Sequence, residues 1–402
     1  MKIRVSEVTG TIIMIWIVMI SGVWSIRLPS VVSVSINCVI AIWMILKMIK
    51  NRKYNGFYTA IILSIILISV MIINSDINSW LTYIMIIIFI IYGLYFCNFW
   101  SVEKFTRIYC KIIIFITLMS LFGYFFRDYL YKIPGLHPII EGQSVSYINY
   151  YFYLYCIELP DRNCAIFWEP GAFAVFIAIA IYLKLMFDKE NIKTNLIIYF
   201  IGLITTKSTL GYTVILFAIL MYYLQISGKK GVVYKVIVGI LIGIILMEIM
   251  IDIGAFENIQ NKLFSGFNND PSTRARSIAQ LIDLTIVEHN PITGVGFIGY
   301  QYQVKIIGSL FGQAWTMAAN TFTYMCALFG IPYFLIIIRG LTGLRAKENN
   351  KILNITCIIF IIWIFIPQNF VQKPIFYILV FWGYSLLSKK RNFLRIRSES
   401  YE

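Results

Sequence analysis

Long apolar segments alternate with short polar connections along almost the whole chain. A hydrocarbon core about 30 Å thick is crossed by roughly 20 apolar residues in a helix, and segments of about that length recur through all 402 residues. The pattern predicts about twelve membrane-spanning helices, centred near residues 8–25, 30–46, 57–74, 80–98, 109–126, 171–187, 195–210, 211–227, 234–251, 320–338, 352–369 and 374–388. We therefore expect an all-α integral membrane protein that forms a single polytopic domain over residues 1–402.

The composition agrees with this pattern. Hydrophobic residues make up 59% of the chain and charged residues 13%, whereas a soluble domain is about 25% charged. These values exclude a soluble globular enzyme and a nucleic-acid-binding protein, so the net charge of +15 needs another explanation. Most of the 34 Lys and Arg residues lie at the two ends of the chain and in alternate connections on the same side. The positive-inside rule then places both termini in the cytoplasm and predicts the lipid bilayer as a partner.

Two connections are much longer than the rest, residues 127–169 and residues 252–319, and both are predicted on the outer side. Long connections in a compact protein are usually functional or disordered. These two contain aromatic, glycine, proline and charged residues, which argues against disorder, so we expect the chemistry to be outside. Their positions spoil any symmetry between the halves of the chain, which argues against a transporter built from repeats.

The first long connection ends in Arg162-Asn-Cys-Ala-Ile-Phe-Trp-Glu169-Pro170. Proline fits the first turn of a helix, so Glu169 is predicted at or beside the N-cap, where it either caps the helix or faces a site at the membrane surface. Arg162 has a planar guanidinium that suits a phosphate or carboxylate. The alternative is a structural salt bridge from Arg162 to Asp161 or Glu158.

The second long connection contains an amphipathic helix that opens with Asp270-Pro-Ser-Thr-Arg274-Ala-Arg276. Two arginines in the first turn oppose the helix dipole unless an anion is nearby. They are therefore candidate anion ligands, and the alternative is contact with lipid phosphates. Arg276, Gln280 and Asp283 are predicted to share a polar face.

A glycine-rich turn follows that helix, with the sequence His289-Asn-Pro-Ile-Thr-Gly294-Val-Gly296. Its glycines allow a ligand to approach the backbone closely, and Tyr300 follows one turn later. His289 is a candidate general base or phosphate donor, and the alternative is that it only caps the helix.

Weaker signals are Lys207 and Gln368, which are polar residues in connections near the membrane surface. Cys156 and Cys164 are the cysteines of the first long connection, and they are either a disulfide pair or two unrelated thiols. Only two histidines are present, and no Cys or His spacing suits a metal. The sequence therefore predicts no metal site and no cofactor.

At these motifs the chain resembles the bacterial O-antigen polymerase (Wzy-type) and O-antigen ligase superfamily. Arg162 to Pro170 resembles the Arg-x-x-Gly-x-Phe-x-Glu-Pro stretch of such polymerases, although Ala165 replaces the glycine. Arg274 to Gly296 is similar to an arginine helix that runs into His-Pro-x-x-Gly-x-Gly. Asn320-Thr-Phe-x-Tyr resembles the start of the following span, where ligases usually carry His-Asn; here Ala319 precedes Asn320, which favours a polymerase.

The resemblance implies a GT-C-like fold in the bacterial inner membrane, with short amphipathic helices in two long periplasmic loops. A growing glycan would move from undecaprenyl diphosphate to the non-reducing end of another lipid-linked repeat unit. Candidate diphosphate ligands are Arg162, Arg274, Arg276, Lys207, Gly294 and Gly296; candidate catalytic residues are Glu169, His289 and Arg162; candidate sugar-binding or supporting residues are Tyr300, Asn320 and Gln368. A chain-length-regulating co-polymerase and the flippase are the implied protein partners.

Two other functions remain open. An O-antigen ligase would transfer the glycan to lipid A-core. A lipid-linked oligosaccharide flippase, from a different class, would place charges inside spans along a pathway, whereas here they gather in the external connections.

Overall fold

The computed structural model describes residues 5–26, 28–133, 139–141, 146–226, 271–310, 320–345 and 351–399. The chain divides into two compact units. Unit 1 comprises Met1–Leu28, Glu103–Phe264 and Ala346–Ile364, and unit 2 comprises Pro29–Val102, Ser265–Arg345 and Phe365–Glu402. Of the predicted spans, residues 234–251 lie outside the described residues.

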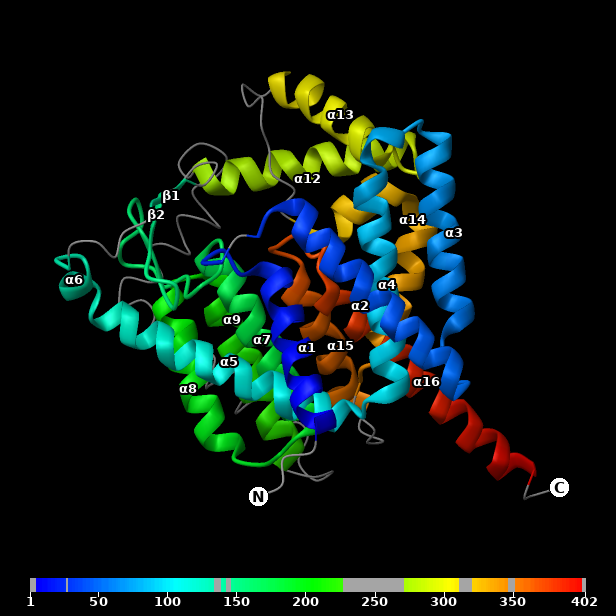
Figure 1. The fold of residues 1–402 in the computed structure, drawn as a ribbon, viewed down its shortest axis with the longest axis horizontal. Helices are drawn as coiled ribbons and strands as arrows, with labels where there is room; N and C mark the ends of the chain where they lie inside the picture. Colours follow the sequence, from blue (N-terminus) through cyan, green and yellow to red (C-terminus); the bar gives the residue numbers. More distant parts are fainter. Residues whose placement is uncertain are drawn as a thin grey trace. The chain divides into compact units, whose positions relative to one another are not determined.

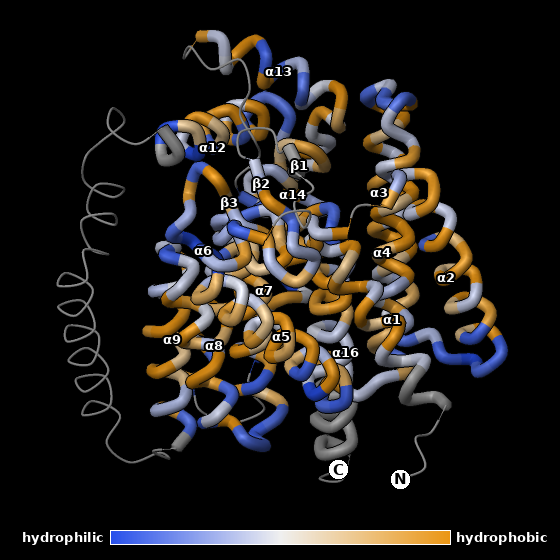
Figure 2. The backbone as a smooth tube through the Cα atoms, turned by 60° about the vertical axis from the view of Figure 1, so that its left-hand side comes forward, coloured by the Kyte–Doolittle hydropathy of each residue, from blue (hydrophilic) through white to orange (hydrophobic). Residues whose placement is uncertain are grey.

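The described ranges are mostly helical, as in an all-α membrane protein. Every predicted span apart from residues 234–251 overlaps a helix. Within the described ranges, five helical segments are long and apolar enough to cross a membrane: Ser30–Asn51, Ile77–Phe99, Val102–Phe125, Pro170–Phe187 and Thr321–Thr342. The total number of spans and the GT-C-like fold stay predictions. Figure 2 shows how apolar residues cover such helices along most of their length.

Unit 1 is built around a buried helix. Its described helices are α1 (Val5–Gly22), α5 (Val102–Phe125), α6 (Arg127–Leu130), α7 (Pro170–Phe187), α8 (Ile192–Thr206), α9 (Thr209–Ile226) and α15 (Lys351–Phe365). α7 is apolar on all sides, and its residues from Ala172 to Leu185 are buried, with α8 and α9 packed against it. A helix without a polar face is stable only when other elements cover it.

The first long connection contains a small sheet, which the sequence analysis did not predict. Strands β1 (Ile139–Glu141), β2 (Ser146–Asn149) and β3 (Leu154–Cys156) pair in antiparallel order, with Tyr147 opposite Cys156. In the described part of this connection the helix between α5 and α7 is the four-residue α6, so short amphipathic helices here stay a prediction. Tyrosine and β-branched residues favour a half-buried strand, and Tyr147 and Tyr153 are buried core residues.

Both cysteines of that connection are buried free thiols. The Cys164 Sγ–H donates to Leu154 O at 3.2 Å, and Cys156 Sγ lies 3.8 Å from Glu158 Oε2. Desolvation raises the pKa of Cys164 well above its ordinary value. The structure thus supports two packed thiols, not a disulfide.

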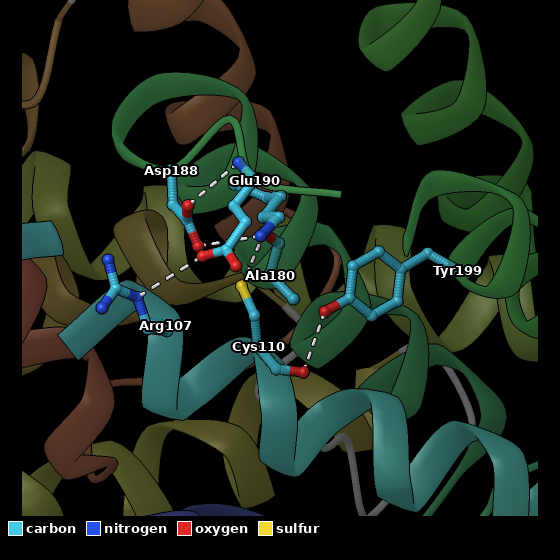
Figure 3. Close-up of polar contacts among 7 residues, drawn as sticks. Arg107, Cys110, Ala180, Asp188, Glu190 and Tyr199 are labelled. Atoms are coloured by element: carbon cyan, nitrogen blue, oxygen red, sulfur yellow. Dashed lines mark hydrogen bonds and ion pairs between the residues drawn. The ribbon is translucent and has the colours of Figure 1, made fainter. Parts of the chain in front are cut away.

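A cluster of polar contacts joins α5, α7 and α8 (Figure 3). Lys184 Nζ lies 2.8 Å from Asp188 Oδ2, with side-chain exposures of 5% and 8%. The Tyr199 hydroxyl donates to Cys110 O, and the Cys110 thiol donates to Ala180 O. These bonds fix the packing of the three helices at the end of α7.

The described part of unit 2 consists of apolar helices with two further helices across one end. The former are α2 (Ser30–Asn51), α3 (Phe57–Ile73), α4 (Trp80–Phe99), α14 (Thr321–Thr342) and α16 (Pro374–Glu399), with the short η1 (Ile77–Ser79) between α3 and α4. The latter are α12 (Pro271–His289) and α13 (Gly296–Leu310). Figure 1 shows α12 and α13 at the end of unit 2 where α3 finishes and α4 begins.

A kink in α14 receives the glycine-rich turn between α12 and α13. Gly330 has φ +81° and ψ 167°, and Pro332 lacks an N–H, so the helical bonding is interrupted there. The turn supplies the missing partners: Ile331 N–H donates to Pro291 O at 2.8 Å, and Val295 N–H donates to Ala327 O at 3.0 Å. Two irregular segments thus satisfy each other's backbone groups, as buried non-helical backbone requires.

Contacts inside each unit agree with the predicted alternation of sides. In unit 1, Asn163 N–H donates to Thr205 O, which joins the first long connection to the end of α8. In unit 2, Thr323 of α14 donates to Asp283 of α12. Each contact joins segments that the sequence pattern assigns to the same side. Which side faces the cytoplasm stays a prediction.

Candidate functional site

The candidate residues divide between the two units. Unit 1 holds Arg162, Glu169 and Lys207. Unit 2 holds the other candidates: Arg274, Arg276, His289, Gly294, Gly296, Tyr300, Asn320 and Gln368.

In unit 1, Arg162 contacts the C-terminal end of α8, where Lys207 is the next residue of the chain. Arg162 Nε–H donates to Thr206 O at 3.2 Å, and the next residue, Lys207, is the C-cap with φ +47°. Lys207 is exposed and Arg162 is half-buried. Asp161, one of the two salt-bridge partners considered for Arg162, pairs with Arg127 at 3.2 Å. Two cations held on adjoining backbone segments favour a bound anion because each lowers the cost of bringing negative charge close.

Asn163 fixes this junction from inside. Its side-chain amide donates to Ser120 Oγ at 3.2 Å and to Thr205 Oγ1 at 3.0 Å, and its carbonyl oxygen accepts from Ala165 N–H at 2.9 Å. Ala165 has φ +52°, a conformation in which glycine is favoured. The resemblance expected a glycine at this position, and the structure shows why.

Glu169 is the N-cap residue of α7, as predicted, but its carboxylate makes no capping hydrogen bond. Its backbone is extended, with φ −163° and ψ 161°, and Pro170 occupies the first helical position. The alternative that Glu169 serves as a side-chain cap is therefore wrong. The half-buried carboxylate is placed where the first turn of α7 favours negative charge.

In unit 2, α12 presents its arginines at one end and buries an acid near its middle. Arg274 and Arg276 are exposed. Asp283, predicted on the polar face with Arg276, is 0% exposed. It accepts from the Tyr300 hydroxyl of α13 at 2.8 Å and from the Thr323 hydroxyl of α14 at 2.6 Å. Desolvation raises the pKa of Asp283 to about 7.

Asp283 is a residue that the sequence reasoning missed. The available signal was its position between Ile282 and Ile286, which are both buried. Tyr300 is only 5% exposed and its hydroxyl is used by Asp283. The structure therefore gives Tyr300 a supporting position rather than a sugar-contacting one.

His289 is exposed at the C-terminal end of α12, and its Nδ1 lies 2.8 Å from Thr285 O. A carbonyl oxygen can only accept, so Nδ1 carries the hydrogen of this bond. In the neutral ring Nε2 then keeps its lone pair and can accept a proton. His289 thus caps its own helix and keeps an atom that could act as a base.

The arginines and His289 lie at opposite ends of one continuous helix. Arg276 and His289 are 13 positions apart in α12, which corresponds to about 20 Å along the axis. An atom bound by Arg276 at one end of α12 is therefore far from His289 at the other end.

The glycines of the turn have packing roles. Gly294 N–H donates to Asn290 O at 3.1 Å, so the expectation that this amide binds a phosphate is wrong for this structure. A Cβ on Gly294 would collide with the backbone of Leu328. A Cβ on Gly296 would lie 2.6 Å from Asp76 Oδ2, and its φ is +66°. Glycine is needed here because the turn packs directly on α14 and on Asp76.

The first turn of α14 gathers the remaining candidates. Asn320 is the N-cap, and its side chain accepts from Phe322 N–H at 2.9 Å. The Thr321 hydroxyl donates to Gln368 O and accepts from Phe370 N–H at 3.0 Å. Asn320 and Gln368 are both buried. These bonds, with that of Thr323 to Asp283, tie α12 and the connection before α16 to one helix end. Ala319 lies outside the described residues.

Asp76, in the connection between α3 and η1, is a second acid that the sequence reasoning missed. It is 0% exposed and accepts from Phe297 N–H at 2.5 Å, from Ile298 N–H at 3.3 Å and from the Tyr83 hydroxyl at 2.8 Å. More than 200 positions separate Asp76 from the helix it caps, so no local pattern reveals the contact.

Among the described residues, no group of three or more His, Cys, Asp or Glu side chains is arranged to hold a metal ion. The cationic side chains described above are the groups that could hold an anionic ligand.

Comparison with protein families gives a match to part of the chain. Residues 194–338 match the family model described as O-antigen ligase, and this segment runs from α8 to α14. No curated protein matches the chain at a significant level. The matched segment includes Lys207, the arginine helix, His289 and the glycine-rich turn. The apolar helices agree with a multi-pass membrane protein, and the match supports a relationship to the O-antigen polymerase/ligase superfamily.

Proposed function

We propose that this protein is an O-antigen or related polysaccharide polymerase. It transfers a growing glycan from undecaprenyl diphosphate to the non-reducing end of another lipid-linked repeat unit, on the periplasmic side of the bacterial inner membrane. The observation that carries the proposal is the helix α12, which lies within the matched segment and exposes Arg274 and Arg276 in its first two turns.

In the reaction, an acceptor hydroxyl oxygen forms a bond to the anomeric carbon of the donor sugar. The bond from that carbon to the diphosphate oxygen breaks, and the electron pair leaves with the lipid diphosphate. The hydroxyl proton goes to a base. Preorganised cations stabilise the charge that develops on the leaving group. Arg274 and Arg276 are the proposed cations in unit 2, and Arg162 and Lys207 are those in unit 1.

Two residues are candidates for the base, Glu169 and His289. A base must reach the hydroxyl within about 3 Å, and the hydroxyl lies about 3–3.5 Å from the carbon it attacks. His289 is about 20 Å along α12 from Arg276. If the arginines hold the donor diphosphate, His289 is therefore too far along α12 to be the base.

The second candidate function is the O-antigen ligase, which the description of the matched family favours. Against it stands the resemblance, because ligases usually carry His before the asparagine at position 320 and this chain has Ala319. A lipid-linked oligosaccharide flippase is the candidate from another class. The proposed protein partners are a chain-length-regulating co-polymerase and the flippase of the same system.

The test is a lipopolysaccharide gel from cells that lack the gene, with and without the wild-type gene restored. Core carrying one repeat unit and no ladder would support the polymerase, because flipping and ligation still work. Loss of all repeat units from the core would point to the ligase or the flippase. An unchanged ladder would overturn the proposal.

A further inference from the structure

The buried carboxylate of Asp76 joins the start of α13 to the connection between α3 and η1. Asp76 receives two successive backbone N–H groups, from Phe297 and Ile298, at the start of α13. These are amides that a helix cannot satisfy internally, and a carboxylate there also faces the positive end of the helix dipole. Hydrogen bonds are directional, so these two fix the orientation of α13 as well as its distance from Asp76.

Asp76 is itself fixed from the other side. The Tyr83 hydroxyl of α4 donates to Asp76 Oδ2 at 2.8 Å. The Tyr83 ring packs edge-on against Phe297 at 5.2 Å between centroids, and Phe297 packs against Phe329 at 5.7 Å. The start of α13 is thus clamped between α4 and α14.

From α13 the constraint passes to α12 by two routes. The first is the turn itself, whose backbone is bonded to the kink of α14. The second is the Tyr300 hydroxyl, which donates from α13 to Asp283 of α12. Both routes hold the C-terminal half of α12, whereas Arg274 and Arg276 stand at its N-terminal end.

We propose that Asp76 is a positioning residue that aims the arginine end of α12 by holding the start of α13. This inference rests on the proposed function, because it assigns Asp76 to the site that Arg274 and Arg276 form. The helix acts as a lever: a tilt of about 5° at the turn moves a point 20 Å away by roughly 2 Å. A displacement of about 1 Å can reduce an enzymatic rate on the order of 100-fold.

The test uses the full-length protein, purified in lipid nanodiscs and supplied with lipid-linked repeat units. Asp76→Ala removes the acceptor, and Asp76→Asn keeps one oxygen that can accept from a single N–H. We expect a fall in kcat of on the order of 10- to 100-fold for Asp76→Ala and a smaller fall for Asp76→Asn. Asn74→Ala is the matched control, because Asn74 is in the same connection and bonds only within α3 in the described contacts, to Val70 O.

A double-mutant cycle separates positioning from general destabilisation. Arg276→Lys keeps the charge but loses the planar fork of the guanidinium. If Asp76 acts through the arginine end, Asp76→Asn costs clearly less in the Arg276→Lys background than in the wild type. Additive losses in the two variants would overturn the proposal.

Amide hydrogen exchange provides a readout that does not depend on activity. We expect faster exchange across residues 290–300 in Asp76→Asn, with the rest of α3 and α4 unchanged. Unchanged exchange there would overturn the positioning proposal alone. Full activity of Arg276→Ala would instead overturn the phosphate role of the arginines, and the proposal for Asp76 would fall with it. If Asp76→Ala does not fold, Asp76→Asn and Tyr83→Phe give the same comparison.

Discussion

The separation of Arg276 and His289 gives the sharpest prediction about the chemistry. The two residues lie 13 positions apart in one helix, and at about 1.5 Å per residue this is about 20 Å. The base acts on the attacking hydroxyl and the cation on the leaving diphosphate of the same anomeric carbon, so the hydrogen-bond and attack distances put these two side-chain groups only about 6–10 Å apart. One reaction centre therefore includes one end of α12 and not both.

If the arginine end is that centre, Arg276→Ala should reduce the rate of polymerisation on the order of 10²- to 10³-fold, the usual cost of a lost oxyanion ligand. His289→Asn should reduce it less than about 10-fold, because removal of a true general base costs on the order of 10²- to 10⁴-fold. Asparagine is the suitable replacement, since its amide can still donate to Thr285 O and preserve the helix end.

The assay is the initial rate of chain extension from lipid-linked repeat units, normalised to the protein present in the membrane. Gln301→Ala, an exposed polar change on α13, serves as the control. Losses of 100-fold or more in both Arg276→Ala and His289→Asn would refute the reasoning from the length of α12. A large loss in His289→Asn alone would move the centre to the other end of the helix.

Three further predictions concern stability. Lys184→Met should lower the free energy of unfolding by about 3–5 kcal/mol, because Asp188 is left charged and buried; a thermal melt of the detergent-solubilised protein that matches wild type would contradict this. Gly330→Ala should destabilise by about 1–3 kcal/mol from backbone strain, with a clash against Ile292 O in addition. Gly299→Ala, inside α13, should cost less, because its Cβ would lie 3.1 Å from Val295 Cβ and its φ is not positive. The pKa of Asp283 is raised by burial to about 7, so its contribution to stability is full below about pH 4, the unfolded pKa, and is lost as the pH rises through about 7. The melting temperature should therefore fall between pH 5 and pH 8 in the wild type, and Asp283→Asn should remove that part of the slope.

The sequence by itself determined the helices and the residues worth testing. Apolar length marks a span because the bilayer leaves a helix no other way to satisfy its backbone, and helices were found at the predicted spans throughout the described ranges. Proline at 170 and 271 marked the starts of α7 and α12 because its fixed φ and missing N–H suit the first turn. The family match then fell on the segment that contains the arginine helix.

Only the tertiary structure decided what the buried acids and the glycines do. Asp283 looked like part of a polar face, but α13 and α14 cover it and supply two hydroxyl donors. Gly294 looked like an open phosphate cradle, but its amide is used within the turn and its Cα lies against α14. Asp76 carried no signal at all, because the backbone amides that it binds follow it by more than 200 residues. Periodicity reports the environment of a residue within its own element, whereas these roles depend on contacts between distant elements, which form only when the chain has folded.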